Sequence, residues 1–169
     1  MHLRKYQPTD FALLAQWVTS PALLFQFAGT DFTYPLIQKQ VDSYQATHPD
    51  RLFYMACLPN NEPFAFGEII PQDNNVPRLG RLLVGDTAKR GKGLGAIFVQ
   101  LLVDECVKLY NCSFIELYVL TTNAQAIRCY QKVGFRLVAD SHFQLVVNGE
   151  SFLIDKMLLQ MDHNSWHLP

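Results

Sequence analysis

The sequence has no long apolar run, no excess of one charge and no apolar signal core after its basic first residues. No segment approaches the ~20 consecutive apolar residues of a membrane-spanning helix. The 14 Lys and Arg side chains nearly balance the 15 Asp and Glu side chains, which leaves a formal net charge of −1. This balance gives no support to binding of nucleic acid or of a membrane surface. We therefore expect a cytoplasmic protein that binds neither.

The cysteines also lack a pattern. Cys57, Cys106, Cys112 and Cys129 show neither metal-ligand spacing nor the spacing of a disulfide framework, and they lie within apolar patterns. We interpret them as reduced core residues and expect no metal.

The chain contains no internal repeat, low-complexity tract or linker, and 169 residues suit one domain. We predict a single domain over residues 1–169, in which residues 162–169 form a loose tail.

What the sequence does contain is a glycine-rich loop at residues 90–96, between a strand pattern and a helix pattern. Residues 78–84 are largely apolar, as in a buried strand, and residues 94–109 repeat apolar side chains at helical spacing. The first turn of a helix leaves backbone N–H groups unpaired, and the helix dipole adds positive charge there. Glycines let a ligand approach these groups closely. The stretch therefore predicts an anion-binding site.

Three kinds of phosphate-binding loop compete for these residues. A nucleoside triphosphatase loop needs Ser or Thr after Gly-Lys, and Gly93 stands there instead, which excludes this class. The dinucleotide-binding fingerprint fits Gly91-x-Gly93-x-x-Ala96, with Glu116 at about the expected distance. Its context is poor, because residues 85–90 separate the strand from the first glycine and Glu116 lies inside a strand pattern.

The third loop, Arg90-x-x-Gly93-x-Gly95, resembles the pyrophosphate loop of the GNAT superfamily of acetyl-CoA-dependent N-acetyltransferases. A second block that resembles the superfamily follows in the right order, Asn123-x-x-Ala126-x-x-x-Tyr130-x-Lys132-x-Gly134-Phe135. The early aromatic-rich helices and residues 82–86 resemble the bacterial branch that includes ribosomal-protein N-terminal acetyltransferases. The resemblance implies a mixed α/β fold, with a mostly antiparallel twisted sheet splayed at the cofactor cleft and helices on both faces.

The predicted elements outside these blocks agree with that fold. Ser20 and Pro21 carry the signals of a helix start, with Gly29 after its end, and Asn148-Gly149 is a strong hairpin signal. We expect Gly134 to end a helix that begins at Asn123. Strands are predicted over residues 3–6, 52–58, 64–70, 114–120, 135–138, 142–147 and 151–159, and further helices over 11–18 and from 34 onward.

The resemblance implies an acyltransferase that moves the acetyl group of acetyl-CoA to a primary amine by direct attack, without a metal. It places the end of the strand over residues 78–84 along the pantetheine arm and the glycine-rich loop on the pyrophosphate. The second block would lie beside the arm. A backbone N–H near Val84 or Gly85 would polarise the thioester carbonyl. The implied cofactor-binding residues are Leu83, Val84, Gly85, Arg90, Gly91, Lys92, Gly93, Leu94, Gly95, Ala96, Asn123, Ala126 and Tyr130.

Two side chains are the candidate catalytic residues. Tyr130 occupies the family's tyrosine position and is expected to protonate the departing thiolate. Glu68 shares a strand face with large apolar side chains, so its pKa should be raised and it can accept the proton of the amine. A carboxylate simply paired with a nearby arginine is the structural alternative for Glu68, and Asp86, His142, Tyr34 or a chain of waters are alternative bases.

Two other functions remain open at this point. The same fold can hold acyl-CoA as a sensor without transferring anything, and Gly91-x-Gly93 can belong to a nicotinamide-binding oxidoreductase. The acceptor is either a protein or peptide N-terminus or a small amine, and the chain is either a monomer or a homodimer.

Overall fold

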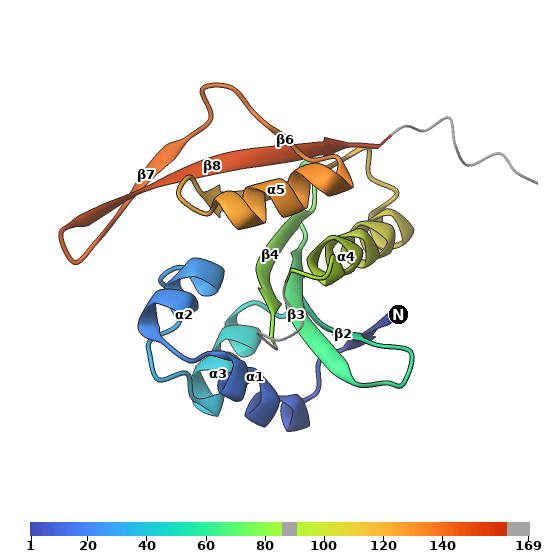
Figure 1. Cartoon of the computed structure of the whole chain (residues 1–169), viewed down its shortest axis with the longest axis vertical. Helices are drawn as coiled ribbons and strands as arrows, with labels where there is room; N and C mark the ends of the chain where they lie inside the picture. The colour runs from blue at the N-terminus through green and yellow to red at the C-terminus, as the bar shows by residue number, and fades with distance from the viewer. Residues whose placement is uncertain (86–90, 162–169) are drawn as a thin grey trace, which may run out of the picture.

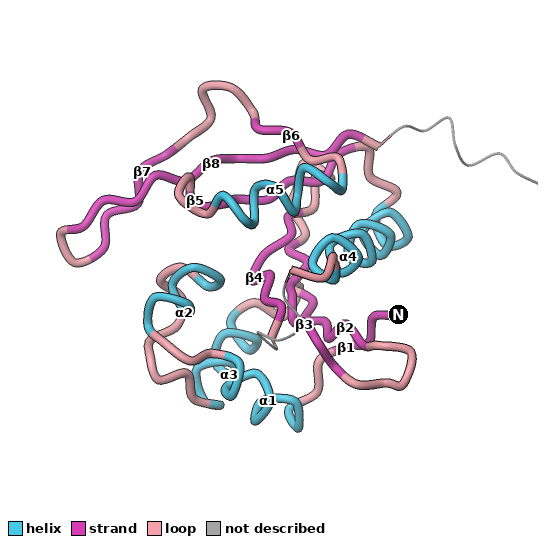
Figure 2. The backbone as a smooth tube through the Cα atoms, viewed as in Figure 1, coloured by secondary structure: helices cyan, strands magenta, loops and turns pink. Residues whose placement is uncertain are grey.

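The computed structural model describes residues 1–85 and 91–161, which form eight strands and five α-helices around one mixed sheet (Figures 1 and 2). The helices are η1 (Pro8–Asp10, a 3-10 helix), α1 (Phe11–Trp17), α2 (Pro21–Ala28), α3 (Gln38–Thr47), α4 (Leu94–Tyr110) and α5 (Ala124–Val133). The strands are β1 (His2–Lys5), β2 (Leu52–Cys57), β3 (Pro63–Ile70), β4 (Arg78–Val84), β5 (Phe114–Leu120), β6 (Arg136–Leu137), β7 (Phe143–Val147) and β8 (Glu150–Gln160). No helix in these two ranges is long and apolar enough to cross a membrane. The predicted tail and Arg90 lie outside the described residues.

Local signals set the ends of α2 and α5 as predicted. The Ser20 hydroxyl accepts a hydrogen bond from the Leu23 N–H at 3.2 Å, and the Asn123 side chain accepts one from the Ala126 N–H at 3.2 Å. Gly134 ends α5 with φ +107°, a backbone conformation that favours glycine. In contrast, α3 begins at Gln38, later than predicted, because the backbone is still extended at Ile37.

The strands follow the order β1-β2-β3-β4-β5-β8-β6, and β7 pairs with β8. Every described pairing is antiparallel except the parallel one between β4 and β5. Those two strands pair at Arg78–Glu116 and Leu79–Leu117, after which β4 continues along β3 and β5 along β8. The sheet is therefore splayed between β4 and β5, and the predicted mixed α/β fold is confirmed.

A β-bulge interrupts β4 beside this splay. Two residues of β4, Arg81 and Leu82, lie opposite the single residue Gly67 of β3. Arg81 has φ +50°, in the left-handed region, which costs a non-glycine residue about 1–2 kcal/mol. Its guanidinium lies over the ring of Tyr44, 4.0 Å from the ring centroid, so the bulge directs this side chain towards α3.

Helices lie on both faces of the sheet (Figure 1), and a hydrophobic core lies on each face. One core joins the sheet to α4 and α5, and the other, rich in aromatic rings, joins it to α1, α2 and α3. The second core reaches the end of β4, where a Cβ atom on Gly85 would lie 1.9 Å from the Trp17 ring. Glycine is therefore required at the point where β4 leads into the glycine-rich loop.

Candidate active site

A cavity of about 640 Å³ lies where β4 and β5 separate. Its walls come from α2, β4, the start of α4, the end of β5, α5 and the β7–β8 hairpin. This volume is in the range of sites for small molecules and cofactors. Among the described residues no group of three or more His, Cys, Asp and Glu side chains is placed to hold a metal ion.

The glycine-rich loop forms one end of this cavity. Gly91 and Gly93 have φ values of +76° and +81°, and Gly93 is the N-cap of α4 without a side-chain cap. The first intrahelical donors are the N–H groups of Ala96 and Ile97, which both bond to the Gly93 carbonyl. The amides before them, at the N-terminus of a 17-residue helix, suit an anionic group such as a pyrophosphate.

The predicted loop residues do not all reach the cavity. Gly91, Gly93, Gly95 and Ala96 line it. Leu94 instead packs against the core beneath α4, and exposed Lys92 is not part of the described lining.

The end of β4 supplies the adjoining wall. Leu83 and Val84, which the resemblance places along a pantetheine arm, line the cavity. The Gly85 N–H donates to the Phe64 carbonyl at 2.9 Å. This donor is engaged within the sheet, which argues against Gly85 as the group that polarises a thioester carbonyl.

Helix α5 presents three predicted residues to the same cavity, Asn123, Ala126 and Tyr130. Tyr130 is buried and packs edge-on against Phe135, with ring centroids 6.4 Å apart. Burial raises the pKa of Tyr130, so its hydroxyl stays protonated at neutral pH. This hydroxyl makes no hydrogen bond with the described part of the chain, and it is therefore available as a proton donor to a ligand.

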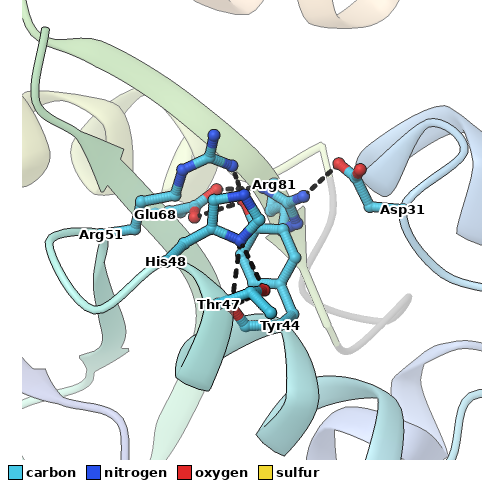
Figure 3. A network of polar contacts seen from close by, with 7 residues as sticks. All are labelled: Asp31, Tyr44, Thr47, His48, Arg51, Glu68 and Arg81. Atoms are coloured by element: carbon cyan, nitrogen blue, oxygen red, sulfur yellow. Dashed lines mark hydrogen bonds and ion pairs between the residues drawn. The ribbon is translucent and has the colours of Figure 1, made fainter.

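Glu68 lies behind the cavity wall, in a polar network (Figure 3). Its side chain is fully buried, with one oxygen paired with Arg81 and the other accepting a hydrogen bond from the Tyr44 hydroxyl at 2.9 Å. Burial raises the pKa of Glu68, although Arg81 and Tyr44 oppose the shift. The pKa direction agrees with the sequence-based expectation, but Arg81, not Glu68, lines the cavity.

The network extends from Arg81 to a residue that sequence patterns did not single out. Arg81, of which 5% of the side chain is exposed, also pairs with Asp31, whose side chain is 53% exposed and lines the cavity. One signal was available in the sequence. Arg81 interrupts an apolar strand, and a buried charge of this kind requires an acidic partner.

The alternative bases occupy less suitable places. Tyr34 and His142 are exposed and do not belong to the described cavity lining, and Asp86 lies outside the described residues. Glu116, the acidic residue of the dinucleotide-binding alternative, is buried. It is bonded by Arg78 at 2.9 Å, Gln72 at 2.7 Å and Lys156 at 2.5 Å. Its carboxylate is thus already engaged.

Comparisons with known proteins agree with this geometry. The sequence matches the acetyltransferase (GNAT) family over residues 20–135. It is 30% identical over 98 residues to a spermine/spermidine N(1)-acetyltransferase of Bacillus subtilis (strain 168), a stretch that covers 56% of this chain and 62% of that relative.

The fold is similar to that of solved acetyltransferases. The aminoglycoside acetyltransferase AAC(6')-Ib in complex with coenzyme A superposes with a TM-score of 0.73 at 23% identity, over 94% of both chains. The spermidine N-acetyltransferase of Vibrio cholerae in complex with CoA and spermine gives a TM-score of 0.75 at 15% identity, again over 94% of both chains. Because the family match spans more than half of its length, this chain belongs to the acetyltransferase (GNAT) family.

Proposed function

We propose that this chain is an N-acetyltransferase that moves the acetyl group of acetyl-CoA to a primary amine. The observation that carries the proposal is one cavity that runs from the glycine-rich start of α4, through the gap between β4 and β5, to the buried Tyr130. Membership of the acetyltransferase family supports it, as do relatives named for acetylation of spermidine and aminoglycosides. The ribosomal-protein branch stays a prediction.

Each part of this cavity suits one part of acetyl-CoA. The amides at the N-terminus of α4 suit the pyrophosphate, with Lys92 and Arg90 expected to add charge. The backbone at Leu83 and Val84 is expected to form hydrogen bonds with the pantetheine amides, in the way that a strand edge pairs with an added strand. Asn123 both caps α5 and borders the cavity, which is consistent with contact to the arm.

The chemistry follows from that placement. The nitrogen of the neutral amine attacks the thioester carbonyl, a C–N bond forms and the C–S bond breaks. The leaving thiolate takes a proton from the Tyr130 hydroxyl, and the nitrogen releases a proton to a base. Glu68 stays a predicted base that accepts the proton through a water, since its carboxylate does not border the cavity. If so, Glu68→Gln should lower the rate most at lower pH, and an unaltered pH profile of the rate excludes the role.

One experiment separates the candidate functions. Acetyl-CoA is titrated calorimetrically into the wild type and into Gly93→Asp, and thiol release is followed with a panel of amines. We expect Gly93→Asp to abolish binding, because it sets a side chain and a negative charge against the pyrophosphate. Gly149→Asp is the matched control, since Gly149 also has a positive φ, of +83°, but lies in the β7–β8 hairpin.

The same assay tests the role of Tyr130. Tyr130→Phe should keep the Kd for acetyl-CoA and lower kcat by about a hundredfold, the lower range for loss of a general acid. An unchanged kcat would remove Tyr130 from the mechanism. Binding of acetyl-CoA without thiol release for any amine would favour the sensor, and binding of NAD instead of CoA would favour the oxidoreductase.

A further inference from the structure

The charges on the cavity wall are unevenly distributed. Asp31 is the one acidic side chain among the described residues of the lining, whereas Arg78, Arg81, Arg128 and Lys132 are basic. A site built for a polycation needs several carboxylates, because each ammonium group taken from water requires a partner. The described part of the wall supplies one carboxylate.

Two of the basic side chains belong to the cofactor half of the cavity. Arg128 and Lys132 lie four residues apart on α5, so they share one side of the helix. Between them, Cys129 faces the start of α4, since a Cβ atom on Gly95 would lie 3.0 Å from its sulfur. Their charge therefore lies with the phosphate-binding end and complements the anionic cofactor.

The other half of the cavity is bounded by aromatic rings. Phe25 of α2 packs against Phe152 with ring centroids 4.5 Å apart, and Tyr118 packs edge-on against Phe143 at 5.3 Å. The Arg78 guanidinium already covers the Tyr118 ring, 4.5 Å from the ring centroid. A second ammonium group at this ring would therefore meet an arginine, and the rings of Phe25 and Phe143 offer it no carboxylate.

Asp31 is held so that one of its oxygens remains available. Its Oδ2 pairs with Arg81, while Oδ1 accepts no hydrogen bond from the described residues. Arg81 is shared between Asp31 and Glu68, so two carboxylates face one guanidinium. Arg51 reaches the Tyr44 hydroxyl and is not part of the described lining.

We infer, resting on the proposed acetyl transfer, that the acceptor is a small primary monoamine with an apolar body. Asp31 binds its ammonium group, which releases one proton to the base before the nitrogen attacks the thioester, and the aromatic side chains of α2, β5 and β7 hold its carbon skeleton. A polyamine would place a second ammonium against Arg78 or against the aromatic wall, without a carboxylate partner. The acceptor class thus differs from that of the polyamine acetyltransferases to which this chain is similar.

A matched pair of amines tests the inference. Hexylamine and hexamethylenediamine differ in one terminal amino group, and phenethylamine and spermidine extend the comparison. We expect kcat/KM to be at least about tenfold higher for hexylamine than for the diamine, because the second charge finds no partner. An equal or higher value for the diamine or for spermidine would overturn the inference.

Substitution of Asp31 provides the second arm. Asp31→Asn should raise KM for hexylamine by about tenfold, as expected for loss of one charge-assisted contact, and leave the Kd for acetyl-CoA unchanged. Asp73→Asn is the control, since Asp73 is exposed and does not line the described cavity. An unchanged KM in Asp31→Asn would also overturn the inference.

The outcomes separate the two proposals. Faster acetyl transfer to the diamine would support the acetyltransferase proposal and overturn the inference of a monoamine acceptor. Absence of transfer to any amine, with acetyl-CoA bound, overturns both.

Discussion

Glu68 and Glu116 are buried carboxylates on the two strands that flank β4, and each pairs with an arginine of β4. Glu68 of β3 pairs with Arg81, in the bulge, and Glu116 of β5 pairs with Arg78, where the ladder is regular. Their surroundings differ. Arg81 is 5% exposed, whereas the two basic partners of Glu116, Arg78 and Lys156, are 29% and 30% exposed.

The pKa values of the two carboxyls move in opposite directions. Burial raises both, but in Glu116 hydrogen bonds from Lys156, Gln72 and Arg78 outweigh burial, and the pKa falls below its ordinary value. In Glu68 burial outweighs Arg81 and Tyr44, and the pKa rises. The ion pair of Glu116 with Arg78 therefore stabilises the pairing of β4 with β5, at the end where these strands are hydrogen-bonded. Glu68 holds the bulge residue that borders the cavity.

Removal of each carboxylate should have the largest effect on stability, and the two losses should differ. Glu68→Ala leaves a buried guanidinium short of one partner and should lower the free energy of unfolding by ~3–5 kcal/mol. Glu116→Ala should lower it by ~1–3 kcal/mol, because Arg78 and Lys156 can turn towards water. Urea titrations at pH 7 measure both, with the exposed Glu150→Ala as a control. Equal losses of unfolding free energy in the two variants would mean that the exposure of the basic partners does not determine the cost of removing the carboxylate.

The stability contributions of the two carboxyls should depend on pH in opposite directions. The contribution of Glu116 is present above the ordinary pKa of 4.5 and is lost as the pH falls through its lowered pKa, so the Glu116→Gln deficit should shrink on acidification. The pH-dependent part of the contribution of Glu68 is present below 4.5 and is lost as the pH rises through its raised pKa. The Glu68→Gln deficit should therefore shrink as the pH rises.

Urea titrations between about pH 3 and about pH 8 measure these deficits. Each unit of difference in pKa between the folded and unfolded states corresponds to ~1.4 kcal/mol. Deficits that change with pH in the same direction for both variants would contradict the opposite pKa shifts.

The smallest expected effect belongs to Tyr44. Tyr44→Phe removes the hydroxyl that donates to Glu68 and should lower the free energy of unfolding by ~0.5–1.5 kcal/mol. It should also move the pH-dependent loss linked to Glu68 to higher pH, because this hydrogen bond lowers the pKa. Tyr54→Phe, whose hydroxyl bonds Lys5 and Glu105, is the control. A similar shift in Tyr54→Phe would show that the effect is not specific to the network.

Features of the fold that depend on a few neighbouring residues were predictable from the sequence. Ser20 caps α2, Asn123 caps α5, Gly134 ends α5, and Asn148-Gly149 joins β7 to β8. Ala126 and Tyr130 share one face of α5, as their spacing of four predicts, and both line the cavity.

Features that depend on pairing between distant segments were not predictable in this way. The bulge at Arg81 forms because two residues of β4 lie opposite one residue of β3 in the strand register. The pairing of Arg81 with Asp31 joins residues that are 50 positions apart in the chain. The strand alternation placed Glu68 on an apolar face, but only the packing of Tyr44 and Arg81 over that face puts it behind the cavity wall.

The sequence by itself determined where the glycine-rich loop lies, which strand and helix flank it and which tyrosine the second block contains, because turns, caps and helical periodicity are local properties. The tertiary structure alone decided the width of the gap between β4 and β5, the partners of the two buried glutamates and the placement of Asp31 as the single carboxylate among the described residues of the cavity wall. These properties arise from strand register and from long-range packing, since the charge that a buried side chain can keep depends on the groups that the fold brings to it.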